Sequence, residues 1–341
     1  MALDRASDSY HRLVNEIYPR MVDLLLRRYQ RRADKSLRDV YAMDDDFLHV
    51  EAEILSFAGE YQAEIVAILD DPQLFTSLVH QFVLSTLEFT YANNQFVYFD
   101  QNEVQVLERI YRSYLLEMQA ILQDNPGPQV LRSRLDALVT AHFADLSANI
   151  SRFFDPGSDV ETQRNFILRQ VVCREYSPAF QLEILGIHPG DLVPPVLDLG
   201  CGKSGRLVQH LHWLGLRAFG VDRLVDDLPG LRSADWLTLR LQPGAWGSIL
   251  SHMAFSNHFI FNHLYRRGDP QAYARQYMAV LGALQPGGSF YYSPGLPFIE
   301  RLLPATQYAV TVKRLAGPSQ SILAAELQDD ALYTTRVTRL A

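Results

Sequence analysis

The stretch VLDLGCGKSGRLVQHLHWLGLRAFGVD, residues 196–222, decides the fold of this chain. It runs from a short apolar strand through a glycine-rich turn and a segment of helical periodicity into a second strand that ends on Asp222. Gly200 and Gly202 permit a tight turn and the close approach of a ligand, and Gly205 lets the helix pack on the strand. Asp222 is placed to accept hydrogen bonds from ribose hydroxyls. This order predicts half of a nucleotide-binding fold; the competing interpretation is a glycine turn that only connects a strand to a helix.

Composition favours a soluble protein that acts on small molecules. The 341 residues allow about two domains, and 48% of them are hydrophobic, which is enough for real cores. A formal net charge of −8 without a long basic run argues against nucleic acid or an anionic membrane surface as a partner. The two cysteines, Cys173 and Cys201, indicate neither a disulfide framework nor a cysteine metal site. A charged start and the lack of a long apolar run predict a cytoplasmic chain that does not span a membrane. The oligomeric state stays open.

Residues 1–175 are expected to form an all-helical domain that acts as a lid over the ligand crevice. Apolar side chains recur at helical spacing over residues 47–69, 74–89, 104–122 and 132–154. Turn residues separate these stretches, and aspartate or asparagine stands at several expected helix starts. The aromatic residues of this part are dense, and most of them are expected in a core or an interface.

Residues 176–341 are expected to form the nucleotide-binding domain. Arg174 to Tyr176 lead into its first strand, so they are predicted near the mouth of the glycine turn; a surface turn is the alternative. Asp235 is placed to accept a hydrogen bond from an adenine amino group while Trp236 packs on the ring, although Asp235 equally fits a helix cap. After a strand at 246–251, the stretch SHMAFSNHFIFNHL is expected to be a loop at the carboxyl edge of the sheet.

Three motifs of the second half, DLGCGKSG, Asp222 and LQPGGSFYYS, together resemble the class I S-adenosylmethionine-dependent methyltransferases. The resemblance implies an α/β, Rossmann-like domain with a mostly parallel seven-stranded sheet whose last strand is antiparallel. S-adenosylmethionine would lie across the carboxyl ends of the first strands, and no metal is expected. Lys203-Ser204 stand where the family often has one residue, which leaves the side-chain contacts of the loop open. The cofactor-binding residues that the resemblance implies are Asp198, Gly200, Gly202, Ser204, Gly205, Asp222, Asp235, Trp236 and Ser251.

The segments EYSPAFQLEILGI, GCGKSG and SHMAFSNHF are similar to the azetidine-2-carboxylate synthases of nonribosomal-peptide pathways. In that group the amine of S-adenosylmethionine attacks its own γ-carbon, and methylthioadenosine leaves. The chain has Ser251-His252-Met253 where many amine and nucleobase methyltransferases carry a polar residue followed by Pro-Pro-aromatic. The sequence therefore favours intramolecular cyclisation; the alternative is a conventional methyltransferase that acts on a small molecule.

Cyclisation needs a folded methionine chain in a site that excludes water. An aromatic face attracts the sulfonium by about 0.5 to 2 kcal/mol without offering a nucleophile. Tyr176 is the first candidate for this face and Phe153 the second. The Tyr176 hydroxyl, Ser204 or Asn149 are candidates to orient the amine by accepting hydrogen bonds. A methyltransferase would instead need an open approach to the methyl carbon and a base, for which His252 or His258 would serve.

Three further interpretations compete with these predictions. A nicotinamide-dependent dehydrogenase uses the same loop geometry, but the sequence has a Pro-Gly-Gly turn, a terminal strand pair at 308–312 and 332–337, and no second glycine-rich site. A metal site could involve His252, His258 and His263, but their spacing is not that of a zinc helix. A non-catalytic scaffold is disfavoured by the intact glycines and Asp222.

Overall fold

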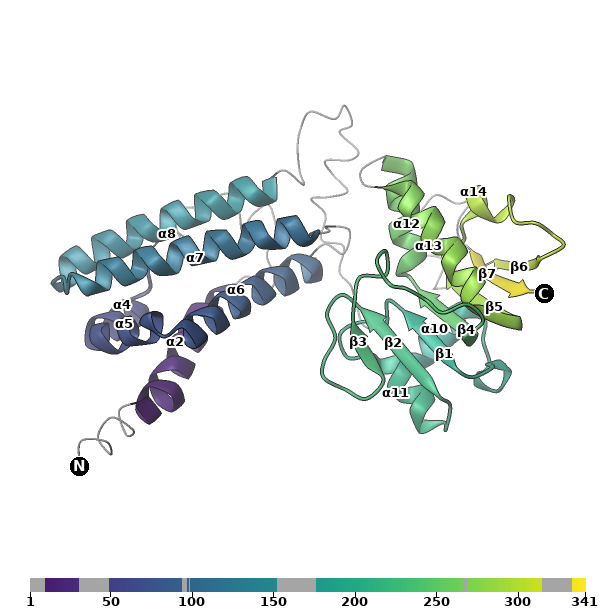
Figure 1. Cartoon of the computed structure of the whole chain (residues 1–341), viewed down its shortest axis with the longest axis horizontal. Helices are drawn as coiled ribbons and strands as arrows, with labels where there is room; N and C mark the ends of the chain where they lie inside the picture. Colours follow the sequence, from purple (N-terminus) through teal and green to yellow (C-terminus); the bar gives the residue numbers. More distant parts are fainter. Residues whose placement is uncertain are drawn as a thin grey trace. The chain divides into compact units, whose positions relative to one another are not determined.

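The computed structural model describes residues 10–30, 49–93, 97, 99–151, 176–265, 269–314 and 333–341. By its internal contacts the chain divides into two compact units, Met1–Cys173 and Arg174–Ala341. Figure 1 shows helices alone in the described part of the first unit and a sheet with helices in the second. Neither unit has, among its described residues, a helix long and apolar enough to cross a membrane.

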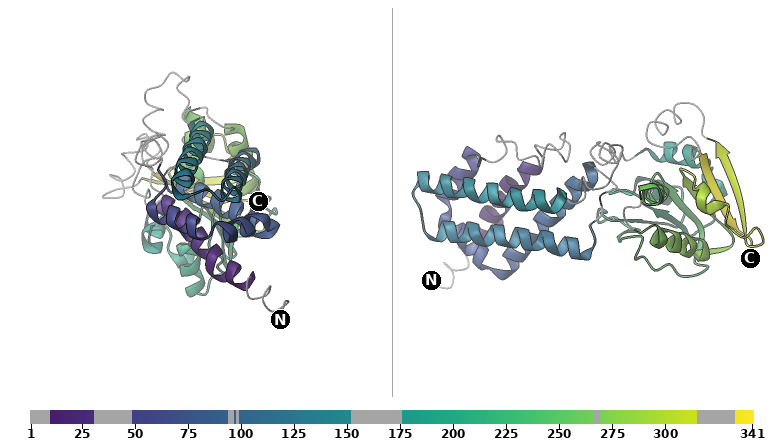
Figure 2. Two further views of the ribbon diagram at one scale, coloured as in Figure 1. Left: turned by 90° about the vertical axis from the view of Figure 1, so that its left-hand side faces the viewer. Right: turned by 90° about the horizontal axis from the view of Figure 1, so that it is seen from above.

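The first unit is a bundle in which the two long helices α7 and α8 lie side by side (Figures 1 and 2). Its core is made of buried aliphatic and aromatic side chains from all the helices. The expected helix over 47–69 is interrupted at Tyr61, which has a non-helical backbone. The elements are η1 (Leu13–Ile17), α2 (Tyr18–Gln30), α4 (Ala52–Glu60), α5 (Gln62–Asp70), α6 (Pro72–Asn93), α7 (Gln101–Gln123) and α8 (Pro128–Ser151).

Helix α7 shows how local sequence sets these elements. Asp100 accepts a hydrogen bond from the backbone N–H of Glu103 at 2.8 Å, and the Glu103 carboxylate accepts one from the backbone N–H of Asp100 at 2.7 Å. This capping box stabilises the helix start by about 1 kcal/mol. Leu107, Tyr111 and Leu115 follow at four-residue spacing, and all three are buried. The predicted helix over 104–122 is confirmed.

The second unit contains a seven-stranded sheet of order β3-β2-β1-β4-β5-β7-β6. Neighbouring strands from β3 to β5 pair in parallel, whereas β7 is antiparallel to both β5 and β6. The predicted α/β class, with a mostly parallel Rossmann-like sheet and an antiparallel last strand, is confirmed. The strands are β1 (Val196–Leu199), β2 (Ala218–Asp222), β3 (Leu231–Ser233), β4 (Trp246–His252), β5 (Leu284–Ser293), β6 (Tyr308–Arg314) and β7 (Tyr333–Arg339).

Helices cover both faces of this sheet, because successive strand residues point to opposite sides. Leu197 and Ile249 belong to one core with α12 and α13, while Val196 and Leu250 belong to another with α10 and α11. Strands buried on both faces explain the nearly continuous apolar runs in the sequence. The helices are α10 (Pro178–Leu185), η4 (Pro189–Asp191), α11 (Arg206–Trp213), α12 (Phe255–Tyr265), α13 (Pro270–Ala283) and α14 (Pro297–Glu300).

The expectation of a loop after β4 is wrong, because residues 255–265 form α12. The Ser251 hydroxyl accepts a hydrogen bond from the backbone N–H of Phe255 at 3.0 Å, which satisfies one of the open donors at the helix start. Phe255 and Phe259, one turn apart, are buried and pack edge to face. Histidine, serine and asparagine residues interrupt this buried aromatic stripe and hide its helical spacing in the sequence.

A buried carboxylate joins β5, β7 and α14. Glu300 accepts hydrogen bonds from the hydroxyls of Tyr292, Tyr333 and Thr335 and from the backbone N–H of Leu296. Such a fully satisfied network specifies one packing arrangement. It anchors the segment that follows the carboxyl end of β5.

Candidate functional site

The glycine loop after β1 has a backbone that only glycine fits well. Gly200, Gly202 and Gly205 have φ angles of 84°, 75° and 55°. A Cβ atom on Gly200 would lie 2.1 Å from the Cβ of Ala254, so the loop passes directly against the start of α12. The loop is also held to β2, because the N–H of Gly200 donates to the carbonyl of Val221 at 2.8 Å. The predicted roles of Gly200 and Gly202 in a tight turn agree with this geometry.

Gly205 begins α11 and allows close packing. A Cβ atom there would lie 2.5 Å from the side chain of Leu231, in β3. Ser204, which precedes it, is partly buried in the turn. Its predicted contact with the methionine end of a ligand stays a prediction.

Asp222 ties the end of β2 to the glycine loop. Its carboxylate accepts hydrogen bonds from the backbone N–H groups of Gly202 at 3.0 Å and Arg223 at 2.7 Å. Burial raises the pKa of Asp222, and the charge of Arg223 and these hydrogen bonds oppose the shift. Each carboxylate oxygen has two lone pairs, so acceptor capacity remains for hydroxyl groups. The carboxylate therefore organises the glycine loop, and its predicted contact with ribose hydroxyls stays a prediction.

Asp198 is the most unusual charged group of the site. It lies in β1 opposite Gly220 of β2 and Leu250 of β4, and only 1% of it is exposed. Its Oδ2 atom accepts no hydrogen bond from any described residue. Burial, with the neighbouring charge of Asp222, raises the pKa of Asp198 to about 7. A buried oxygen atom without a hydrogen-bond partner lowers the stability of the folded chain, and such atoms are often found where a ligand binds.

Asp235 and Trp236, the two residues predicted to contact adenine, both interact with other residues of the second unit. The Asp235 carboxylate accepts a hydrogen bond from the backbone N–H of Leu237 at 2.9 Å, within a turn over residues 236–238. No helix follows this turn, so the alternative interpretation of Asp235 as a helix cap is wrong. Trp236 is buried and lies edge to face with His258, at 5.0 Å between ring centroids. The adenine contacts of Asp235 and Trp236 stay predictions.

Ser251 links two elements of the site. It is completely buried, and its hydroxyl donates to the carbonyl of Leu199 at 2.9 Å while it accepts from Phe255. These bonds hold the end of β1 to the start of α12. A direct contact of Ser251 with a ligand stays a prediction.

Tyr176 belongs to an aromatic cluster that the sequence did not fully indicate. Its ring stacks on Phe180 at 5.1 Å and lies edge to face with His252 at 5.2 Å. Ser177 caps α10 by accepting from the N–H of Phe180, which sets Phe180 one helical turn beyond Tyr176. The segment EYSPAF therefore carried a signal for Phe180: a Ser-Pro helix start with an aromatic residue on each side.

From the sequence, His252 is predicted to act only in the methyltransferase alternative, as a base. In the structure its ring lies against Tyr176. Its Nε2 atom is buried and accepts or donates no hydrogen bond among the described residues. Burial lowers the pKa of His252 to about 4, so the ring is neutral near pH 7. The next residue, Met253, has a φ of 54°, and such backbone outliers cluster at functional sites.

Two candidate catalytic residues belong to the first unit. Asn149 is buried in α8, and its Nδ2 atom donates no hydrogen bond to a described residue. Phe153 lies outside the described residues. Their roles stay predictions.

The remaining histidines do not form a metal centre in the described part of the chain. No group of three or more His, Cys, Asp or Glu residues is placed there to hold an ion. Burial, followed by the charge of Arg223, lowers the pKa of His258 well below its ordinary value. His263 stacks on Phe298 at 3.9 Å.

No protein-family model and no curated protein matches this chain. It is similar in structure to an S-adenosylmethionine-dependent methyltransferase from Mesorhizobium loti, with 18% identity, 42% of this chain and 89% of that chain covered, and a TM-score of 0.29. For the 1,6-didemethyltoxoflavin-N1-methyltransferase of Burkholderia thailandensis the identity is 16%, the coverage is 48% of this chain and 75% of that chain, and the TM-score is 0.29. For the [4+2]-cyclase SpnF the identity is 12%, the coverage is 48% of this chain and 79% of that chain, and the TM-score is 0.30. At these identities the likeness concerns the fold alone.

Proposed function

We propose that this chain is an enzyme that binds S-adenosylmethionine at the carboxyl ends of β1 and β2. One observation carries the proposal: the Oδ2 atom of Asp198 is buried next to the glycine loop and has no described hydrogen-bond partner. A ligand amine would satisfy this oxygen and neutralise its charge. A dinucleotide would instead bring a pyrophosphate to the loop, where the charge of Asp198 would repel it. The site therefore favours S-adenosylmethionine over a nicotinamide cofactor.

The residues of the second unit fit the other parts of this ligand. Asp222 has acceptor capacity for the ribose hydroxyls, and the glycine loop admits close approach of the methionine end. Asp235 and Trp236 are proposed for the adenine ring. S-adenosylmethionine supplies carbon atoms that are electrophilic because they are bonded to a sulfonium.

We further propose that the reaction is the intramolecular cyclisation of S-adenosylmethionine to azetidine-2-carboxylate. The amine nitrogen forms a bond with the γ-carbon while the bond from that carbon to sulfur breaks. Sulfur keeps the electron pair, so methylthioadenosine is released. The amine has to lose one proton to become a nucleophile, and this proton passes to solvent.

The cluster of Tyr176, Phe180 and His252 supports this choice. The two aromatic rings provide faces for the sulfonium, an attraction of about 0.5 to 2 kcal/mol. Neutral His252, with a buried Nε2 atom, provides a hydrogen-bond acceptor that would turn the amine lone pair toward the γ-carbon. Its low pKa makes it a positioning group, since it cannot hold the released proton near pH 7.

The alternative is methyl transfer to a small molecule, and the same His252 favours it. A neutral imidazole at the carboxyl end of β4 would accept a hydrogen bond from an acceptor hydroxyl or amine as readily as from the amine of the cofactor. The two reactions differ in the sulfur-containing product. Methyl transfer gives S-adenosylhomocysteine and needs a second substrate.

Incubation of the purified chain with S-adenosylmethionine alone tests the proposal. Cyclisation predicts methylthioadenosine and azetidine-2-carboxylate in equal amounts, measured by mass spectrometry, above the background of a heat-denatured sample. Methylthioadenosine no higher than that background would end the cyclisation proposal. S-adenosylhomocysteine that forms only after a small-molecule acceptor is added would establish the alternative.

The helical unit is proposed to act as a lid for this site, with Asn149 and Phe153 among its contributions. We also propose a cytoplasmic enzyme whose partners are small molecules, without a role for nucleic acid, a membrane or a bound metal. The acidic net charge supports the small-molecule proposal, because a polyanion would be repelled.

A further inference from the structure

Three neighbouring strands of the sheet each carry a buried polar side-chain atom that has no hydrogen-bond partner among the described residues. These atoms are Oδ2 of Asp198 in β1, Nε2 of His252 in β4 and Oγ of Ser293 in β5. The proposed contacts with the amine of the ligand use Asp198 and His252, and Ser293 takes no part in them. Unsatisfied buried polar atoms are rare in folded proteins, so the third one indicates a ligand as the other two do.

Ser293 and His252 lie side by side on one face of the sheet. They are register partners in the parallel pair of β4 and β5, and such partners are about 4.8 Å apart and point to the same side. The preceding pair on that face, Leu250 and Tyr291, packs in the core with α10 and α11. Ser293 therefore faces the α10 side of the sheet, where the ring of Tyr176 lies against His252.

The backbone holds Ser293 in place before any ligand binds. The Ser293 carbonyl accepts a hydrogen bond at 2.8 Å from the N–H of Met253, the residue directly after His252. Three residues beyond Ser293, the N–H of Leu296 donates to the buried carboxylate of Glu300 at 2.7 Å. A preformed site of this kind lowers the ordering cost of binding.

The two unsatisfied atoms of His252 and Ser293 fit an uncharged hydroxyl group. Only 7% of His252 and 0% of Ser293 is exposed, and burial lowers the pKa of His252 to about 4, so the ring is neutral near pH 7. Burial alone causes this shift among the described residues, so a charged ligand group would lose its hydration without meeting an opposite charge at these two atoms. A hydroxyl group both donates and accepts, so it satisfies the two atoms in either tautomer of the ring.

We propose that Ser293 and His252 form a subsite for one uncharged hydroxyl group. The proposal rests on the proposed S-adenosylmethionine site and names what lies beside the reacting carbon. In cyclisation the hydroxyl belongs to a water molecule through which His252 orients the amine. In methyl transfer it belongs to a small alcohol, whose oxygen forms a bond with the methyl carbon as the bond from that carbon to sulfur breaks and whose proton passes to solvent. Ser293 is a positioning residue in the first case and a substrate contact in the second.

A crystal structure of the full chain with S-adenosylhomocysteine tests the subsite without turnover. We expect an oxygen atom about 3 Å from both Nε2 of His252 and Oγ of Ser293, and Ser293→Ala should lose it. Ser289→Ala should keep it and is the matched control, because Ser289 is a buried serine of the same strand whose hydroxyl already bonds to Thr338 and Arg336. No atom in this position of the unmodified chain, or the amine nitrogen of the ligand in contact with both side chains, would overturn the proposal.

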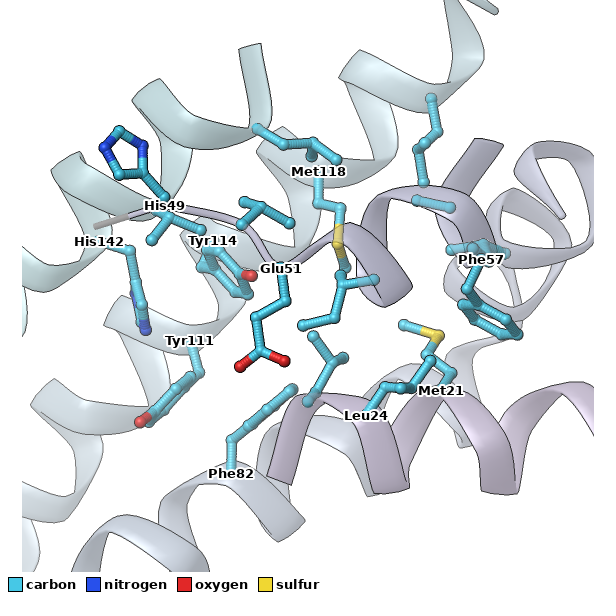
Figure 3. A pocket seen from close by; sticks show the side chains of 18 of the residues that line it. Met21, Leu24, His49, Glu51, Phe57, Phe82, Tyr111, Tyr114, Met118 and His142 are labelled. Atoms are coloured by element: carbon cyan, nitrogen blue, oxygen red, sulfur yellow. The ribbon is translucent and has the colours of Figure 1, made fainter. Parts of the chain in front are cut away.

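Benzyl alcohol added to the crystals distinguishes the two sources of the hydroxyl. An alcohol oxygen in the subsite identifies an alcohol substrate, whereas a water molecule that stays in place identifies water. The helical unit has a pocket of about 80 Å³ with Phe82, Tyr111 and Met118 in its wall, where an aromatic probe would also fit (Figure 3). The crystal locates the probe directly, so benzyl alcohol found in that pocket alone identifies water as the source.

Turnover separates this proposal from the proposed reaction. Ser293→Ala should lower kcat about tenfold, the value of one hydrogen bond, and leave the Kd for S-adenosylmethionine unchanged. Equal kcat values for Ser293→Ala and Ser289→Ala would overturn the role of Ser293. A chain that forms neither methylthioadenosine nor S-adenosylhomocysteine would refute the proposed function, and the oxygen atom in the crystal would still decide the subsite.

Discussion

Replacement of Asp198 by asparagine should stabilise the second unit and weaken ligand binding at the same time. The Asp198 pKa is about 7 in the folded chain against an ordinary value of 3.8. As pH rises from about 4 to 7, the unfolded chain releases this proton first, so folding stability falls through that window and is constant above it. About three pKa units at 1.36 kcal/mol each give a cost of up to about 4 kcal/mol at pH 8.

Asp198→Asn removes this cost, because the amide is neutral at every pH. The variant should gain up to about 4 kcal/mol over the unmodified chain at pH 8 and roughly 2 kcal/mol at pH 5. Its affinity for S-adenosylmethionine should fall by about 1.5 to 3 kcal/mol, the value of a hydrogen bond to a charged group. In the unmodified chain, affinity should also weaken as pH falls below about 7, since protonation removes the carboxylate charge.

Urea unfolding followed by tryptophan fluorescence measures the stability change. The three tryptophans, Trp213, Trp236 and Trp246, all belong to the second unit, so the signal reports on this unit alone. Exposed Asp191 provides the matched control, and Asp191→Asn should change neither the stability at pH 8 nor the affinity for S-adenosylmethionine. A variant at Asp198 that is no more stable at pH 8 and binds S-adenosylmethionine normally in calorimetry would refute the reasoning.

Three other changes test the rest of the site. Gly200→Ala should abolish S-adenosylmethionine binding and lower the Tm, because the added Cβ atom would meet Ala254. Gly215 also has a positive φ but open space around it, so Gly215→Ala should lower the stability by only about 1 kcal/mol. Equal losses of Tm in the two variants would argue against the close approach of Gly200 to Ala254. Tyr176→Leu should reduce kcat far more than affinity, with Tyr176→Phe retaining part of the activity, and a loss confined to KM would contradict a role in the reacting conformation. A fragment of residues 176–341 that turned over at the full-chain rate would disprove the lid proposal.

The α/β half of the fold could be predicted from the sequence because its signals are local. The glycines at 200, 202 and 205 mark positive φ angles, and strand and helix periodicity on either side needs no distant partner. Helix α12 has no comparable local signal. There the decisive interaction is between Ser251 and Phe255 at the end of a buried strand, and polar residues within the helix obscured its apolar face.

The sequence by itself determined the order of strand, glycine loop, helix and acidic residue, and through them the class of the fold. Only the tertiary structure decided that Asp198 is buried beside Asp222 with an open acceptor and that Tyr176 meets His252. These contacts join residues from different strands or helices. They depend on strand order and helix packing, which are set by burial of the two sheet faces and the bundle core, so no local pattern contains them.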